Sequence, residues 1–94
     1  MERRKLSVDE VKVYLHDFRG WEAVDGQITK TFEFGSYSSG VMFASAIGHL
    51  ADHMDHHPDI SITYQKVKVA LNTHDVGGIS LVDFELARRI EAIA

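Results

Sequence analysis

The sequence contains no cysteine, and this absence removes whole classes of chemistry. Disulfide bridges, thiolate metal ligands and cysteine nucleophiles are all excluded by composition. Reactive chemistry is therefore left to oxygen and imidazole side chains. Proline is nearly absent as well, and the single one, Pro58, lies directly after a pair of histidines.

A long apolar run is also missing. The longest uncharged stretch, residues 34–50, is interrupted by glycine, serine and histidine, and it is too short and too polar to span a bilayer. Residues 1–15 carry basic side chains with no continuous apolar run behind them, so they do not resemble a signal peptide. We therefore expect a cytoplasmic protein that has no membrane partner.

The chain has no stripe of basic residues either. Its formal net charge is −4, and its lysines and arginines are scattered, so a phosphate backbone finds no matching surface and we expect no direct nucleic acid binding. The 45% apolar and 26% charged content is ordinary for a globular protein. With 94 residues the chain is too short to build two cores, which predicts a single domain over residues 1–94.

Three segments have apolar residues at helical spacing, and each is preceded by a serine that can cap it. The predicted helices begin after Ser7, Ser36 and Ser80. Gly20 stops the first helix, Pro58 lies just beyond the second, and the third runs toward the end of the chain. The predicted buried stripes are Val8, Val11, Leu15 and Phe18, then Phe43, Ile47, Leu50 and Met54, then Phe84, Ala87 and Ile90.

Two pairs of strands are predicted between these helices. The first pair, within residues 21–34, turns at Asp25-Gly26, a dipeptide favoured in tight hairpins. The second pair comprises residues 60–64 and 66–74, and His74 is predicted to end its last strand on the polar face. Short connections imply antiparallel pairing. We therefore predict an α+β fold of order α-β-β-α-β-β-α, with three helices on one face of a four-stranded antiparallel sheet.

The stretch "DHMDHHPDI", residues 52–60, concentrates histidine and aspartate at the end of the second predicted helix. His49 and His53 are four residues apart, and Asp52, His53 and His56 also lie within one helical turn, so zinc ligation is geometrically conceivable. No HExxH frame accompanies them, and we predict no metal site. His49 and His53 are better explained as complements to the negative end of the helix dipole, partly exposed and not essential.

His56, His57 and His74 are better candidates for acid/base chemistry. Histidine titrates near neutral pH, so imidazoles around one cavity can supply both a proton donor and a proton acceptor, as an elimination of water requires. Asp52, one helical turn before His56, either orients an imidazole or holds a substrate amine, or is simply solvated. For Asp83 the sequence favours a helix-capping role with Ser80.

The residues from 52 to 90 resemble those of the pterin-4a-carbinolamine dehydratase family. The family signature is an acidic residue, three further residues, His-His-Pro, an aromatic residue, a histidine and an aspartate. The corresponding residues here, at the family's spacing, are Asp52, His56, His57, Pro58, Tyr64, His74 and Asp83. The resemblance extends over nearly the whole chain, through Gly20-Trp21, Phe32, Phe34 and "THDVGG". Asp52 stands where glutamate is frequent, and Ile60 stands where animal members carry tryptophan.

This resemblance implies a hydro-lyase that converts a small-molecule pterin, 4a-hydroxytetrahydropterin, to quinonoid dihydropterin in tetrahydrobiopterin recycling, with no cofactor and no metal. By carry-over, His56, His57 and His74 are the catalytic imidazoles, and the resemblance does not assign the roles of acid and base among the three. The residues expected to bind substrate are Asp52, Asp55, Asn72, Thr73 and Asp75, and Asp83 is a possible supporting residue.

The same resemblance implies two alternative functions and an oligomeric state. Animal members of the family also serve as a dimerisation cofactor of a hepatocyte homeodomain transcription factor, so a non-catalytic binding or coactivator module is one alternative. A pterin-binding role in molybdopterin metabolism is the other. Because a small four-stranded sheet has exposed edges, and because the family forms dimers and tetramers, we expect a homodimer or a homotetramer.

Overall fold

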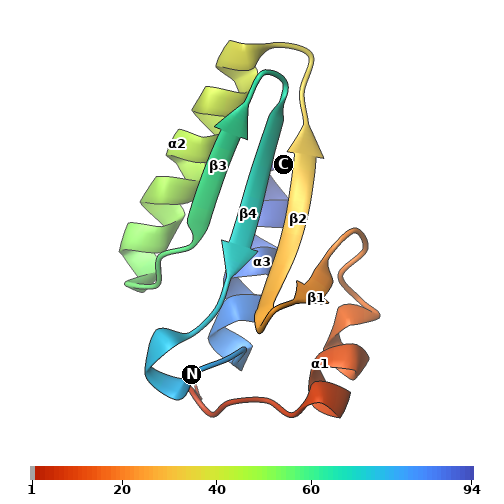
Figure 1. Ribbon diagram of the computed structural model, residues 1–94. Helices are drawn as coiled ribbons and strands as arrows, with labels where there is room; N and C mark the ends of the chain where they lie inside the picture. Colours follow the sequence, from red (N-terminus) through yellow and green to blue (C-terminus); the bar gives the residue numbers. More distant parts are fainter. Residues whose placement is uncertain (1) are drawn as a thin grey trace.

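The computed structural model describes residues 2–94 and confirms the predicted fold class and element order (Figure 1). A four-stranded antiparallel sheet is combined with three α-helices and one short 3-10 helix. The elements are α1 (Val8–Leu15), β1 (Glu22–Val24), β2 (Gln27–Glu33), α2 (Tyr37–Met54), β3 (Asp59–Thr63), β4 (Lys66–Leu71), η1 (His74–Val76) and α3 (Leu81–Ile93).

The strands lie in the order β1-β2-β4-β3, which places the two longest strands at the centre of the sheet. Ile28 pairs with Leu71 and Phe32 with Val67 across the central β2–β4 ladder. Alternate residues of β4 point to opposite faces, so Val67, Val69 and Leu71 share the covered face and are fully buried. Helices α2 and α3 lie behind the sheet in Figure 1, and α1 lies beyond β1.

The core forms between the covered face of the sheet and the helices. Ile47 of α2 and Leu86 and Ile90 of α3 are completely buried there. Helix α1 reaches this core from the side, where the rings of Tyr14 and Phe18 pack on Phe84 with centroids 5.3 and 5.1 Å away. The prediction for Val8 is wrong: this side chain is 72% exposed, because Val11 is the residue of the first turns that faces the core.

All three predicted serine caps are present. Ser7 and Glu10 form a reciprocal capping box on α1, and Ser80 and Asp83 form one on α3. Two boundaries differ from prediction. Helix α1 ends at Leu15, before Phe18, and β4 ends at Leu71.

His74 was predicted to end a strand, and this is wrong because it begins the helix η1. Thr73, just before it, makes an isolated antiparallel bridge with Gly78, which closes residues 73–78 into a loop. Gly77 has φ +68, a left-handed conformation that favours glycine. The two glycines therefore turn the chain back before the strand can extend.

Within residues 2–94, no helix is long and apolar enough to cross a bilayer.

Candidate active site

The end of α2 and the loop after β4 meet around one hollow of about 400 Å³. This volume lies within the range of about 300 to 1,000 Å³ that is usual for small-molecule sites. Both segments contribute imidazoles, and an arginine and three aspartates complete a charged lining. The residues that line it are Arg3, Asp55, His56, His57, Pro58, Asp59, Asn72, His74 and Asp75. We call this space the histidine hollow.

The way α2 ends positions two of the imidazoles. Asp55 adopts a left-handed conformation with φ 50 and ψ 45, and the His56 N–H then donates back to the Ala51 carbonyl at 3.1 Å. This pattern is typical of a helix that stops and reverses sharply. Pro58 prevents the helix from continuing. The consecutive residues His56 and His57 consequently leave the helix in a fixed orientation, one buried and one exposed.

His56 is held by a buried carboxylate on α3. Its Nε2 lies 2.6 Å from Oδ1 of Asp83, and the side chains are 6% and 0% exposed. Oδ2 of Asp83 accepts the Thr73 hydroxyl at 2.9 Å and the Ser80 backbone N–H at 3.0 Å. Since both carboxylate oxygens are acceptors, the Nε2 of His56 carries a proton and donates it to Asp83. The other ring nitrogen, Nδ1, is then the one available for proton exchange.

The Asp83 cluster joins three segments of the chain. Thr73 Oγ1 and Ser80 Oγ are 2.7 Å apart, and the Ser80 hydroxyl accepts the Val82 N–H at 3.3 Å. Because the Thr73 hydroxyl donates to Asp83, the Ser80 hydroxyl donates to Thr73. Every buried polar side-chain atom of residues 2–94 has a partner. The cluster therefore fixes the end of α2, the loop after β4 and the start of α3 relative to one another.

The other two imidazoles lie at the surface of the hollow. His57 Nε2 is 3.0 Å from Oδ1 of Asp52, and these side chains are 58% and 79% exposed. His74 is exposed, and within residues 2–94 its ring makes no side-chain hydrogen bond. One imidazole is thus anchored in the interior, one is oriented at the rim, and one is free to exchange protons with solvent.

Arg3 supplies the positive charge of the histidine hollow. Its Nε and Nη2 donate to the two carboxylate oxygens of Asp75 at 3.2 and 2.8 Å. This hydrogen bonding to Arg3 lowers the pKa of the Asp75 carboxyl below its usual value. Asp55 and Asp59 remain as further carboxylates on the lining. The site accordingly offers imidazoles for proton transfer and carboxylates for binding amino groups.

The structure brings together most residues that the sequence singled out. Six of them line the histidine hollow, namely Asp55, His56, His57, Asn72, His74 and Asp75. Thr73 and Asp83 lie buried behind the lining, and Asp52 contacts His57 at the exposed rim. Tyr64 is different: it lies in the turn between β3 and β4, at the far end of the sheet, and is 73% exposed (Figure 1).

Two residues of the hollow, Arg3 and Asp59, were missed by sequence reasoning. Asp59 belongs to the quoted cluster and directly follows the His-His-Pro signature, so its position was the available signal. Arg3 lies 72 positions from its partner Asp75, and no spacing rule connects them. His49 and His53 are exposed, as predicted; His49 does not line the histidine hollow, and His53 lines a neighbouring hollow with Arg3 and Arg89.

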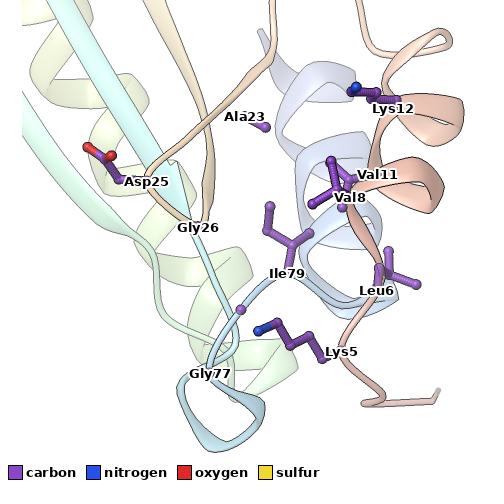
Figure 2. Close-up of a pocket in the computed structure, with 11 residues that line it drawn as sticks. Lys5, Leu6, Val8, Val11, Lys12, Ala23, Asp25, Gly26, Gly77 and Ile79 are labelled. Atoms are coloured by element: carbon purple, nitrogen blue, oxygen red, sulfur yellow. The ribbon is translucent and has the colours of Figure 1, made fainter.

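A second hollow, of about 420 Å³, lies near the start of α1 and has a different character (Figure 2). Leu6, Val8, Val11 and Ile79 give it apolar walls, and it contains no histidine. The two volumes are similar, so size does not distinguish the two hollows, and of these two only the histidine hollow is lined by imidazoles. Within residues 2–94, no three histidine, aspartate or glutamate side chains are arranged to hold a metal ion.

The fold and this cluster of side chains define a small α+β protein with a pocket lined by imidazoles and carboxylates, and comparison with known proteins identifies its family. Residues 4–93 match the family described as pterin 4 alpha carbinolamine dehydratase. The chain belongs to the pterin-4a-carbinolamine dehydratase family, as the resemblance predicted.

Relatives from distant organisms agree with this assignment. A protein of Paracidovorax citrulli, provisionally named pterin-4-alpha-carbinolamine dehydratase, is 43% identical over 97% of this chain and 82% of its own length. A protein of Natronomonas pharaonis with the same provisional name is 43% identical over 96% of each chain. The chain thus spans 82% and 96% of the lengths of these two relatives.

Solved structures share the fold. A transcriptional coactivator/pterin dehydratase from Brucella melitensis superimposes with a TM-score of 0.92 and 33% identity, covering 97% of this chain and 99% of that one. A pterin dehydratase-like protein described as a RuBisCO assembly factor of the alpha-carboxysome superimposes with a TM-score of 0.65 and 24% identity over 79% of this chain and 86% of that one. The second likeness concerns the fold alone.

Proposed function

We propose that this protein is a hydro-lyase that dehydrates 4a-hydroxytetrahydropterin to quinonoid dihydropterin by histidine acid/base catalysis. The observation that carries the proposal is the meeting of His56, His57 and His74, from two separate segments, around one hollow. Membership of the pterin-4a-carbinolamine dehydratase family supplies the substrate class. The carboxylates of Asp55, Asp59 and Asp75 on the same lining suit a ring system rich in amino groups.

The reaction needs one proton delivered and one proton removed. The carbon–oxygen bond at the 4a position breaks as an acid protonates the hydroxyl, and water leaves. A base takes the proton from the adjacent ring nitrogen, and the electron pair of that nitrogen forms the new carbon–nitrogen double bond. The reaction leaves the catalytic acid deprotonated and the base protonated, so exchange with solvent restores both groups.

The three imidazoles differ in ways that suit these tasks. His56 donates its Nε2 proton to Asp83, which leaves Nδ1 as an acceptor, and we assign it the role of base. His74 is exposed, so it can be reprotonated from solvent after each turnover, and we assign it the role of acid. His57, oriented by Asp52, is the third imidazole and contacts the substrate at the rim.

Stopped-flow dehydration of freshly generated 4a-hydroxytetrahydropterin, in the presence of a chelator, tests this function. Wild type should accelerate the reaction, and His56→Ala and His74→Ala should each lower kcat/KM by about 100-fold or more, the usual contribution of a general acid or base. His49→Ala is the matched control, because His49 is an exposed histidine of α2 outside the hollow, and it should retain wild-type turnover. No acceleration by folded wild type would refute the proposal.

The alternative is a non-catalytic binding role, which the exposed apolar side chains of α2 favour. On this helix Tyr37 is 54% exposed, Val41 39% and Met42 72%. Such side chains suit a protein contact. A His57→Ala, His74→Ala double variant that keeps its oligomeric state but loses all turnover supports the enzyme, since a binding module has no use for the imidazoles.

A pterin-binding role in molybdopterin metabolism is tested separately in cells. A deletion strain would be assayed both for its pterin-based cofactor content and for its capacity to recycle hydroxylase pterin. Loss of the first with retention of the second favours that role over the proposed one.

A further inference from the structure

The N-terminal segment crosses the loop that carries His74. We call residues 3–6 the N-terminal strap. The Leu6 backbone N–H donates to the Ile79 carbonyl at 2.8 Å, and the Leu6 side chain is buried at 4% exposure. Lys5 covers Gly78 so closely that a Cβ added to Gly78 would lie 2.9 Å from Lys5 Cε. The strap is therefore held at its inner end, and Arg3 extends from it toward the histidine hollow.

Arg3 is joined to the loop by a two-pronged hydrogen bond. Nε and Nη2 of the guanidinium donate to Oδ2 and Oδ1 of Asp75 at 3.2 and 2.8 Å. Paired bonds of this kind fix the plane of the carboxylate as well as its position. The two side chains are 44% and 60% exposed, and exposed ion pairs contribute little to stability. The effect expected of this pair is therefore on the orientation of Asp75 and not on the stability of the fold.

The three imidazoles of the histidine hollow differ in how they are anchored. Among the residues that line it, Arg3 is the one arginine or lysine, and it shares the lining with Asp55, Asp59 and Asp75. His56 already has Asp83 behind it, and His57 has Asp52. His74 has neither kind of anchor, and its place depends on the short turn η1 that it shares with Asp75.

We propose that Arg3 is a positioning residue: by holding Asp75 it fixes η1, and with it His74, in the orientation that proton transfer requires. This inference rests on the proposed function for its catalytic consequence, although the positioning itself does not. Without Arg3, backbone bonds alone would remain in this loop: the bridge between Thr73 and Gly78 closes its ends, and inside it the Val76 N–H donates to the Thr73 carbonyl at 3.2 Å and the Gly77 N–H to the His74 carbonyl at 3.1 Å. Arg3 adds the bond that holds the side chain of Asp75, the residue next to His74.

Amide hydrogen exchange tests the positioning without reference to activity. In Arg3→Ala, the Val76 and Gly77 amides should exchange roughly tenfold faster, while amides of the β2–β4 ladder stay unchanged. Arg4→Ala is the matched control, because Arg4 is a neighbouring, half-exposed arginine that makes the same two-pronged bond to Glu10, at 3.0 and 2.9 Å, outside the hollow. Equal exchange in Arg3→Ala and wild type would overturn the proposal.

Turnover tests the consequence. Arg3→Ala should lower kcat roughly tenfold with a smaller change in KM, because a misplaced proton donor slows the chemical step. Arg3→Lys keeps the charge but not the fork and should recover only part of the rate. Arg4→Ala should match wild type.

A double-mutant cycle identifies the route of the effect. In an Asp75→Ala background, Arg3→Ala should change kcat less than about twofold, because the carboxylate through which Arg3 acts is already absent. An undiminished effect in that background would mean that Arg3 acts directly on substrate, and the proposal would fail. If wild type shows no dehydration, the proposed function fails while the exchange experiment still decides whether Arg3 positions the turn.

Discussion

Asp83 makes the sharpest test of the site, because one carboxylate both caps α3 and holds His56. Replacement by asparagine keeps the shape but changes one oxygen to an NH₂ group. The amide oxygen can still accept the Thr73 hydroxyl and the Ser80 N–H, as Oδ2 does now. The NH₂ group then faces His56 Nε2, which can no longer donate and must accept. The asparagine therefore reverses the tautomer of His56 and blocks Nδ1 with a proton.

The two expected effects differ in size. Asp83→Asn loses one charge-assisted hydrogen bond and should lower the free energy of unfolding by about 1 to 2 kcal/mol. Its kcat/KM should fall by about 100-fold or more, because a histidine in the wrong tautomer does not accept the proton.

Asp83→Ala is the contrasting variant. It leaves three buried donors without an acceptor and should cost about 3 to 5 kcal/mol. The total stability of a 94-residue domain is about 5 to 14 kcal/mol, so this variant is close to unfolding.

Urea denaturation and stopped-flow dehydration measure these two effects on the same samples. The control is Ser80→Ala, which removes the capping hydroxyl but keeps Asp83 and His56 in contact, and so should lose stability with little change in kcat/KM. Asp83→Asn with wild-type kcat/KM would refute the reasoning, because the tautomer of His56 would then be irrelevant to turnover.

Three other predictions concern stability and assembly. The pKa of Glu85 is lowered from 4.5 to about 2, first by its hydrogen bond from Arg88 and then by that from Arg89, so its stabilising contribution is present above pH 4.5 and is lost as the pH falls toward 2. Acid titration of Glu85→Gln should show a flatter loss of stability in this window, and an unchanged curve would contradict it. Glu91→Ala should lower the free energy of unfolding by about 1 to 2 kcal/mol and alter the emission of Trp21, the only tryptophan, because Lys30 and the Trp21 indole N–H both bond Glu91, at 2.6 and 2.9 Å. Wild type should sediment as a dimer or tetramer, since β3 is an edge strand with a partner on one side within residues 2–94, and a monomer at micromolar concentration would oppose this.

The sequence was sufficient for the local structure, because the signals that specify it are short-range. Serine caps and apolar spacing placed all three helices, and Asp25-Gly26 placed the first hairpin. The same signals failed at element ends. Phe18 was assigned to α1 and His74 to β4, since periodicity does not register a tertiary bridge such as that between Thr73 and Gly78.

The chemical character of the site was also readable from sequence. The absence of cysteine and the cluster at residues 52–60 already pointed to imidazole chemistry, and the spacing of His56, His57 and His74 carried the family resemblance.

Only the tertiary structure gave each imidazole a distinct environment. It buried His56 against Asp83, 27 positions away, and it placed Arg3 on Asp75 across 72 positions. Asp83 illustrates the limit: its sequence context predicts a cap, which it is, yet the same carboxylate also anchors His56. Contacts of this kind depend on how the sheet and helices pack, so no local pattern encodes them.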